Sequence, residues 1–349
     1  MEGKIKFAVI GCGHIGKRHA SMIQGNVGCE LVALCDTRPQ SALALEPYAE
    51  AAFFDSMEEL IAARPDLDVV SIASPNGCHE AQALQALDAG YHVVIEKPMA
   101  LSKAGCERII FKALQKHKQV FCVMQNRYSP PSVWLKEILE RGRLGKIFMV
   151  QINCYWNRDD RYYRPDPVTG RPGSWHGTKD QDGGTLFTQF SHFIDLMYWY
   201  FGDTMNIQTK FKDFMHEKST DFEDSGLVTF DFVEGGIGCL NYSTAVWDRN
   251  LESSITIIAE KGSVKVGGQY MNQVEYCHIK DYVMLELPPS NPPNDYGPYK
   301  GSAANHHYIY ENIVEVLSGN GTITTNALEG MKVVDIIERI YNSDRTTNF

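Results

Sequence analysis

The sequence predicts an α/β protein: an N-terminal Rossmann domain followed by an α+β domain with an open, mostly antiparallel sheet. Three observations support this. Apolar strand patterns alternate with helical patterns over the first 125 residues, a glycine-rich turn follows the first strand, and strand patterns follow one another after residue 225. A break in pattern at 125–131, which contains two prolines, predicts a boundary between domains 1–125 and 126–349.

The composition is that of a globular protein without a nucleic-acid or membrane partner. The 349 residues are 44% hydrophobic and 22% charged, enough for two sizeable cores. A net charge of -10 argues against binding to nucleic-acid phosphates. No apolar run is long enough to span a bilayer, and the first residues lead directly into a strand pattern without a signal segment. We therefore expect a cytoplasmic protein.

The nine cysteines are scattered and include no C-x-x-C pair. Most lie in apolar runs, which predicts buried free thiols rather than a disulfide framework. We expect no metal site, since no spacing typical of zinc ligands occurs.

The first domain alternates short strands with helices. Strand patterns occupy 5–11, 30–36, 68–74, 92–96 and 119–123, and helical patterns include 79–88 and 103–116. Apolar, β-branched strands separated by helices predict a parallel, doubly wound sheet.

The motif Gly11-x-Gly13-x-x-Gly16 stands where the first strand turns into the first helix. Gly11 allows the tight turn, Gly13 lets the backbone approach a pyrophosphate, and Gly16 lets the helix pack on the strand. Asp36 ends the next strand and can accept hydrogen bonds from ribose hydroxyls, which favours NAD over NADP. Arg38 weakens that preference, because an arginine can pair with a 2′-phosphate.

Two further stretches follow strands at the edge where such sheets bind ligands. They are the segment from Ser74 to His79 and the tripeptide Glu96-Lys97-Pro98. Lys97 is either a solvated strand-end lysine or a group that polarises a carbinol oxygen or lowers the pKa of a neighbouring base. The expected cofactor contacts besides the glycines, Asp36 and Arg38 are His14, Ile15, Ser74, Asn76, His79, Glu96 and Lys97.

The second domain begins with a helix at 132–141 and a strand at 147–156. Residues 157–181 form a long irregular segment whose aromatic residues favour an ordered binding loop. Strand patterns follow at 225–232, 237–243, 254–259, 263–266 and 274–280, then a loop at 287–301 and helices at 303–317 and 327–341.

A helical stretch follows Asp182-Gly183-Gly184 and carries His192. Thr188, His192 and Asp195 share one face of this helix, together with Trp199. Taken alone, a histidine among aromatic residues is either a buried core residue or a catalytic base.

Together, the glycine motif, Asp36, Glu96-Lys97-Pro98 and Gly183-Gly184…His192-x-x-Asp195 resemble the glucose–fructose oxidoreductase/inositol dehydrogenase family (Gfo/Idh/MocA) over nearly the whole chain. The resemblance implies hydride transfer between a sugar-type carbinol and a nicotinamide. It also implies that Lys97 and His192 are catalytic, with Lys97 binding the oxyanion and His192 taking the hydroxyl proton. An exposed sheet face that packs against another subunit is typical of the family, so we expect a homodimer or homotetramer.

One position departs from the family pattern. Many members carry Asp four residues before the histidine, where this chain has Thr188. A threonine hydroxyl forms hydrogen bonds but does not titrate usefully. Asp195 either orients His192 or caps loop amides.

The segments around 125–128, 156–175 and 182–192 are similar to a subgroup that oxidises C3 of UDP-N-acetylglucosaminuronic acid and also lacks that carboxylate. Arginines could bind the diphosphate and carboxylate of such a substrate, although acidic residues nearly neutralise the loop, so that a solvated surface is the alternative. The expected substrate contacts are Lys97, Arg127, Tyr128, Arg158, Arg161, Tyr163, Trp175, Thr188, Gln189 and His192.

We therefore expect an NAD-dependent dehydrogenase of a nucleotide sugar. The alternatives are a dehydrogenase of free inositol or aldose and, in another class, a non-catalytic NAD-bound sugar sensor. The sequence leaves open the sugar, the electron acceptor, the retention of cofactor between turnovers and the oligomer count.

Overall fold

The computed structural model describes residues 3–164, 175–297 and 299–343, and the chain divides into two compact units. The first unit comprises the residues up to 124 together with 306–334, and the second comprises 125–305 with the residues from 335 onward. The domain expected at 126–349 thus differs from the observed second unit, because residues 306–334 pack with the nucleotide-binding half.

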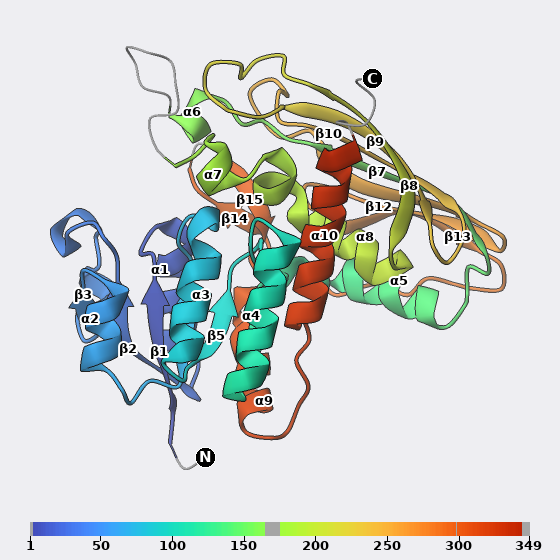
Figure 1. The fold of residues 1–349 in the computed structure, drawn as a ribbon. Helices are drawn as coiled ribbons and strands as arrows, with labels where there is room; N and C mark the ends of the chain where they lie inside the picture. Colours follow the sequence, from blue (N-terminus) through green and yellow to red (C-terminus); the bar gives the residue numbers. More distant parts are fainter. Residues whose placement is uncertain (1–2, 165–174, 298, 344–349) are drawn as a thin grey trace. The chain divides into compact units, whose positions relative to one another are not determined.

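A six-stranded parallel sheet forms the centre of the first unit (Figure 1). Its order is β3-β2-β1-β4-β5-β6, with every neighbouring pair parallel. The strands are β1 (Ile5–Ile10), β2 (Cys29–Cys35), β3 (Ala52–Phe54), β4 (Val69–Ile72), β5 (His92–Ile95) and β6 (Val120–Cys122). This is the doubly wound sheet that the alternating pattern predicts.

Most helices and short helical turns of this unit lie between its strands in the sequence, and two helices come from the C-terminal part of the chain. Together these elements are α1 (His14–Gly25), η1 (Gln40–Ala42), η2 (Glu46–Tyr48), α2 (Met57–Ala63), η3 (Asn76–Cys78), α3 (His79–Asp88), α4 (Lys103–Lys116), α9 (His306–Leu317) and the first part of α10 (Ala327–Ser343). Helix α9 packs against α1, and the ring of Tyr310 lies edge-on to that of Phe7, 5.5 Å between centroids. A helical pattern predicts that α9 has an apolar face, but it does not say which partner covers that face.

A seven-stranded sheet dominates the second unit, in the order β13-β12-β11-β7-β10-β9-β8. All neighbours are antiparallel except β7 and β10, which run parallel. The strands are β7 (Ile147–Tyr155), β8 (Thr204–Lys212), β9 (Ser225–Phe232), β10 (Ile237–Ser243), β11 (Glu252–Ala259), β12 (Gly262–Gly267) and β13 (Gln273–Ile279), with a separate hairpin of β14 (Pro293–Asp295) and β15 (Lys300–Ala303). The predicted mostly antiparallel sheet is confirmed.

One face of this sheet is covered by helices of the same unit (Figure 1). The helical elements of this unit before α10 are η4 (Gln125–Tyr128), α5 (Pro130–Glu140), α6 (Asp160–Tyr163), α7 (Lys179–Asp182), the π-helical η5 (Leu186–Phe190) and α8 (Ser191–Phe201), of which α5 and α8 lie along the sheet (Figure 1). Ring contacts join α8 and η5 to the sheet, with Phe201 packing on Phe232 and Phe190 on Tyr242. The core of the unit therefore lies between α8 and the sheet.

Several short or edge elements are absent from the expected pattern. They are β3, α2, β8, the β14–β15 hairpin and the one-turn helices α6 and α7. The edge strand β8 is exposed along much of its length, so it lacks the apolar alternation that marks a half-buried strand. No helix in the described part of the chain is long and apolar enough to cross a membrane.

Candidate functional site

The glycine-rich turn between β1 and α1 has no room for side chains at two of its glycines. Gly11 has a φ of +85°, and a Cβ there would lie 2.7 Å from the amide nitrogen of Ser74. A Cβ on Gly16 would lie 1.7 Å from the carbonyl oxygen of Gly11. The tight turn and the close helix–strand packing expected from the motif therefore exist in the structure.

Gly13 differs from these two because nothing lies within 4 Å of where its Cβ would stand. It is the N-cap residue of α1, and no side chain caps that end of the helix. The first turn thus presents backbone N–H groups and open space, a combination that fits the diphosphate of a dinucleotide. His14 is exposed and Ile15 half-buried, both in this first turn.

Asp36 follows β2 and is 8% exposed. Its carboxylate accepts hydrogen bonds from the backbone amide of Cys12 at 2.8 Å and from the Arg38 guanidinium at 3.0 and 2.8 Å. Burial opposes ionisation, but the bonds from Arg38 lower the pKa of Asp36. A ribose that binds here must share the carboxylate with Arg38, whose own side chain is 57% exposed and can turn away.

His79 ties together the two segments expected to contact the cofactor. One ring nitrogen lies 3.0 Å from the carbonyl oxygen of Ser74 and the other lies 2.7 Å from that of Pro98. His79 is fully buried, and burial lowers its pKa. These contacts give His79 a structural role, because they link the segment at Ser74 to the one at Pro98. Asn76 is also buried, whereas Ser74 is partly accessible and donates from Oγ to Gln82 at 2.6 Å.

Glu96 lies in a buried polar network of the first unit. Its Oε1 is 2.9 Å from Nε2 of His19 and 3.3 Å from Nε2 of His306, and its Oε2 accepts the amide of Lys97 at 3.1 Å. His19 continues through Nδ1 to the hydroxyl of Tyr310 at 2.6 Å. Burial opposes ionisation, but the two histidines hold the pKa of Glu96 well below its usual range. The network therefore orients the backbone that carries the half-buried Lys97.

Sequence reasoning missed His19, His306 and Tyr310. His19 follows the glycine motif closely enough to be noticed, but residues 125–305 of the second unit separate the other two from Glu96 in the sequence.

In the second unit, Gly183 and Gly184 begin the segment that carries His192. Their φ values are +89° and +136°, and a Cβ on Gly184 would lie 2.6 Å from the hydroxyl of Tyr341. The chain then runs through the π-helical η5 into α8, where His192 is 2% exposed. Such π segments are frequent at functional sites.

Thr188 and Gln189 lie in η5 and are 9% and 5% exposed. The Thr188 hydroxyl donates to the carboxylate and, at 2.8 Å, to the carbonyl of Asp182. Asp182 was not among the expected site residues, although it directly precedes the glycine pair in the sequence.

Arg127 and Asp195 form a bidentate ion pair, with nitrogen–oxygen distances of 2.6 and 2.9 Å. The guanidinium also lies 5.2 Å from the ring centroid of Trp199. Arg127, an expected substrate contact, is thus paired with a buried carboxylate inside the second unit. Asp195 thus pairs with Arg127, a contact that the sequence did not predict.

Arg158 is likewise buried, at 3% exposure. It donates to Gln189 Oε1 at 2.7 Å and to the carbonyl of Asn157 at 2.6 Å, and lies 4.6 Å from the ring of Trp156. Burial lowers the pKa of Arg158. Its role is thus to hold Gln189, an expected substrate contact, in place.

The remaining expected contacts divide by exposure. Tyr163, an expected substrate contact, is 1% exposed, and its ring packs edge-on against that of Tyr162. Arg161 is partly exposed, and its guanidinium donates hydrogen bonds of 2.7 to 3.0 Å to the carboxylate of Asp159. Tyr128 and Trp175 are half-buried, with the ring of Trp175 stacked 3.7 Å from that of His176. Residues 165–174 of the expected binding loop lie outside the described residues.

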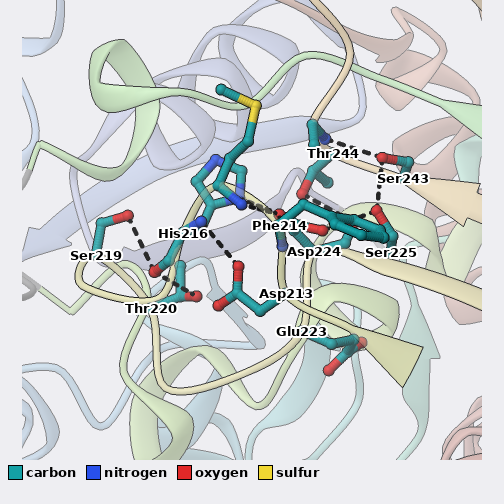
Figure 2. A network of polar contacts seen from close by, with 12 residues as sticks. Asp213, Phe214, His216, Ser219, Thr220, Glu223, Asp224, Ser225, Ser243 and Thr244 are labelled. Carbon is teal, nitrogen blue, oxygen red and sulfur yellow. Dashed lines mark hydrogen bonds and ion pairs between the residues drawn. The ribbon is translucent and has the colours of Figure 1, made fainter.

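A second polar network joins the β8–β9 connection to β10 (Figure 2). Oδ2 of Asp224 accepts the amides of Phe214 and Met215 at 2.9 and 2.8 Å and lies 3.3 Å from Nδ1 of His216. Burial opposes ionisation, but His216 lowers the pKa of Asp224 to about 2, whereas burial raises that of Asp213. Since both lone pairs of this Asp224 oxygen take amide protons, the network organises the loop that follows β8.

Comparisons with known proteins identify both halves of the chain. Residues 5–124 match the model of an oxidoreductase family with an NAD-binding Rossmann fold, and residues 133–265 match the GFO/IDH/MocA C-terminal domain. Among solved structures, the WlbA dehydrogenase from Bordetella pertussis, in complex with NADH and UDP-GlcNAcA, is 30% identical with a TM-score of 0.85, covering 99% of this chain and 97% of that one.

Two curated relatives cover less of the chain. D-glucoside 3-dehydrogenase of Escherichia coli is 31% identical over 69% of this chain and 71% of its own length. Inositol 2-dehydrogenase of Salmonella typhimurium is 28% identical over 66% of this chain and 65% of its own length. The chain is therefore an NAD-dependent dehydrogenase that belongs to the Gfo/Idh/MocA oxidoreductase family.

Proposed function

We propose that this enzyme oxidises a nucleotide-linked sugar, with C3 of UDP-N-acetylglucosaminuronic acid (UDP-GlcNAcA) as the reacting carbon and NAD as the hydride acceptor. The observation that carries the proposal is the similarity, along almost the full length of both chains, to a dehydrogenase crystallised with NADH and UDP-GlcNAcA. Thr188 supports it, because the subgroup that this chain resembles also lacks a carboxylate at that position.

The proposed chemistry assigns one role to each of two residues. His192, as a neutral imidazole, accepts the proton of the C3 hydroxyl while the C3 hydrogen leaves as hydride. Lys97 donates a hydrogen bond to the carbinol oxygen as negative charge develops there. When bound, the nicotinamide supplies the acceptor for that hydride. Glu96 assists by accepting the Lys97 amide and thereby orienting its backbone.

The test is oxidation of UDP-GlcNAcA by the purified protein with NAD, followed by NADH absorbance, both alone and with a 2-oxo acid that would recycle bound cofactor. Turnover should disappear in H192A while NAD still binds; unchanged turnover would refute the assignment of His192 as base. Asp180 is exposed beside the same glycine pair, so D180N serves as a matched control that should keep activity.

A second candidate is the oxidation of a free polyol or simple glycoside, which the inositol and D-glucoside relatives favour. A thermal-shift screen with NAD present separates the two, because a ligand at 100 times its Kd stabilises the folded state by about 2.7 kcal/mol. Stabilisation and turnover with inositol or a glucoside, together with silence toward UDP-sugars, would replace the first proposal.

We also propose that the protein forms a homodimer or homotetramer through the open face of the second unit's sheet. Met149 pairs in register with Ile237 on one side and Ile258 on the other, and the three side chains are 44%, 51% and 45% exposed. Such an apolar row across adjacent strands is typical of a protein–protein contact. Light scattering should report an oligomer for the wild type and smaller species for M149K/I237K.

The nine cysteines are free thiols. This supports the proposed location in the reducing cytoplasm.

A further inference from the structure

The carboxylate of Asp182 and the hydroxyl of Thr188 form a buried pair next to the segment that carries His192. Asp182 ends α7 and is fully buried, and Thr188, six residues later, is 9% exposed. The Thr188 hydroxyl donates both to Oδ1 and, at 2.8 Å, to the backbone oxygen of Asp182. The other carboxylate oxygen accepts the amide of Gly177 at 2.7 Å.

The backbone between the two residues makes this pair possible. The positive φ values of Gly183 and Gly184 turn the chain, and the amide of Thr188 then bonds to the carbonyl of Gly184 at 3.1 Å. Thr188 lies in the π-helical turn η5, which continues into α8, and His192 follows four residues later.

The direction of the hydrogen bond decides what Thr188 can offer a ligand. A hydroxyl carries one proton, and both partners of the Thr188 hydroxyl on Asp182 are acceptors. The proton is therefore committed to Asp182, so Thr188 meets any other group through its lone pairs. A serine or threonine without such a partner could act as donor or acceptor.

The charge of Asp182 acts on neighbouring groups because the site is buried and screened little by solvent. Burial first, and the Asp182 charge second, raise the pKa of both Tyr162 and Tyr163. A negative charge in such surroundings polarises a hydroxyl more strongly than it would in water.

We propose that Asp182 is a positioning residue that acts through Thr188 and makes it an obligate hydrogen-bond acceptor for the substrate. With its proton committed to Asp182, Thr188 acts as a hydrogen-bond acceptor, as does the aspartate found at this position in many relatives. The negative charge, however, lies on the buried Asp182. The inference rests on the proposed function in that it assumes a sugar substrate.

The chemistry of that substrate limits which groups can contact Thr188. In UDP-GlcNAcA the donors on the sugar ring are the hydroxyls of C3 and C4 and the acetamido N–H. Since the C3 hydroxyl gives its proton to His192, Thr188 accepts from a donor on a carbon next to C3. The carboxylate and diphosphate, which are acceptors, are excluded from this position.

The experiment compares kcat and KM of T188V, T188S, D182N and D182N/T188V, with D180N as control and with the Kd for NAD measured for each variant. T188V should lower kcat/KM about tenfold or more, the usual effect of losing such a hydrogen bond in a buried site. T188S should restore most of the activity, and the Kd for NAD should stay unchanged. D182N should cost about as much as T188V, and D182N/T188V should cost no more than the worse single change.

If the losses in D182N and T188V multiply, Asp182 acts independently of Thr188 and the inference is wrong. If D182N does not fold, D182N/T188D provides the second test, because it moves the carboxylate to position 188. Activity well above that of T188V supports the inference, whereas a folded, NAD-binding but inactive D182N/T188D overturns it.

Failure of the proposed function is recognised separately. A wild-type protein that ignores UDP-GlcNAcA but oxidises inositol or a glucoside refutes that function, and the same variants are then compared on the substrate that it does oxidise.

Discussion

The guanidinium of Arg127 and the carboxylate of Asp195 form a bidentate ion pair inside the second unit, with both side chains 1% exposed. Removing one partner leaves a buried charge without compensation, which typically costs about 3–5 kcal/mol. R127M should therefore lower the unfolding temperature strongly in calorimetry, and R127M/D195L should recover most of the loss. Equal or greater loss in the double variant would mean that the pair is not coupled.

The exposed pair of Arg141 and Glu137 provides the matched control. The guanidinium of Arg141 lies 3.4 Å from the carboxylate of Glu137, and the two side chains are 65% and 54% exposed. R141M should therefore change the free energy of unfolding by less than about 1 kcal/mol.

A substitution at Gly13 should weaken NAD binding without lowering the stability of the fold. A Cβ at this position meets nothing within 4 Å in the protein, so G13A should keep the wild-type unfolding temperature. The added methyl group would occupy the space that the cofactor's diphosphate needs, so we expect the Kd for NAD to rise about tenfold or more. Gly25, at the other end of α1, is equally unobstructed, and G25A should leave NAD binding unchanged. NAD affinity can be measured from the quenching of protein fluorescence as NAD is added. Equal effects of G13A and G25A on that affinity would contradict this assignment.

Asp36 and Arg38 should together set the choice between NAD and NADP. In D36A the Arg38 guanidinium loses its carboxylate partner and can pair with a 2′-phosphate, so the ratio of NADP to NAD affinity should rise. The double change D36A/R38A should lose that gain. Tight binding of NADP by the wild type, measured calorimetrically, would count against the role given to Asp36.

Glu223 makes stability depend on pH near neutrality. Burial raises its pKa to about 7 from an ordinary 4.5, although the hydroxyls of Tyr242 and Tyr341 donate to it at 2.7 and 2.9 Å. Because the pKa of Glu223 is higher in the folded than in the unfolded state, protonation of Glu223 stabilises the fold. This stabilisation is fully present below the unfolded-state pKa. It is lost as pH rises through the folded value, by about 3 kcal/mol.

The substitution E223Q removes this titration. The stability of E223Q should therefore fall less than that of the wild type between about pH 5 and about pH 8. The exposed Glu217 gives the control, since E217Q removes the same charge without burial. Parallel pH profiles for the wild type and E223Q would show that Glu223 is ionised throughout.

The nucleotide-binding half could be predicted well because its signals are local. The glycine turn, the strand that ends at Asp36 and the tripeptide around Lys97 each carry their meaning within a few residues. What the sequence could not provide was the partner of each charge. Arg127 and Arg158 are cations in a polar stretch, which predicts anion binding, but folding pairs the first with a carboxylate on α8 and the second with Gln189 and backbone oxygens.

The pair of Asp182 and Thr188 illustrates the same limit at short range. Regular helical spacing links Thr188 to His192, whereas its contact with Asp182 depends on two glycines with positive φ and a π-helical turn. A pattern based on ideal helix geometry does not contain that contact.

The discontinuity of the first unit affects how the protein is completed during synthesis. Helix α9, which brings His306 to Glu96 and Tyr310 to His19 and Phe7, leaves the ribosome only after residues 125–305. Domains generally begin to fold as they emerge. The parallel sheet can therefore begin to fold first, but Glu96 lacks the His306 imidazole and Phe7 lacks the Tyr310 ring until α9 has been translated. The unit that is started first is therefore completed only after most of the second unit has been synthesised.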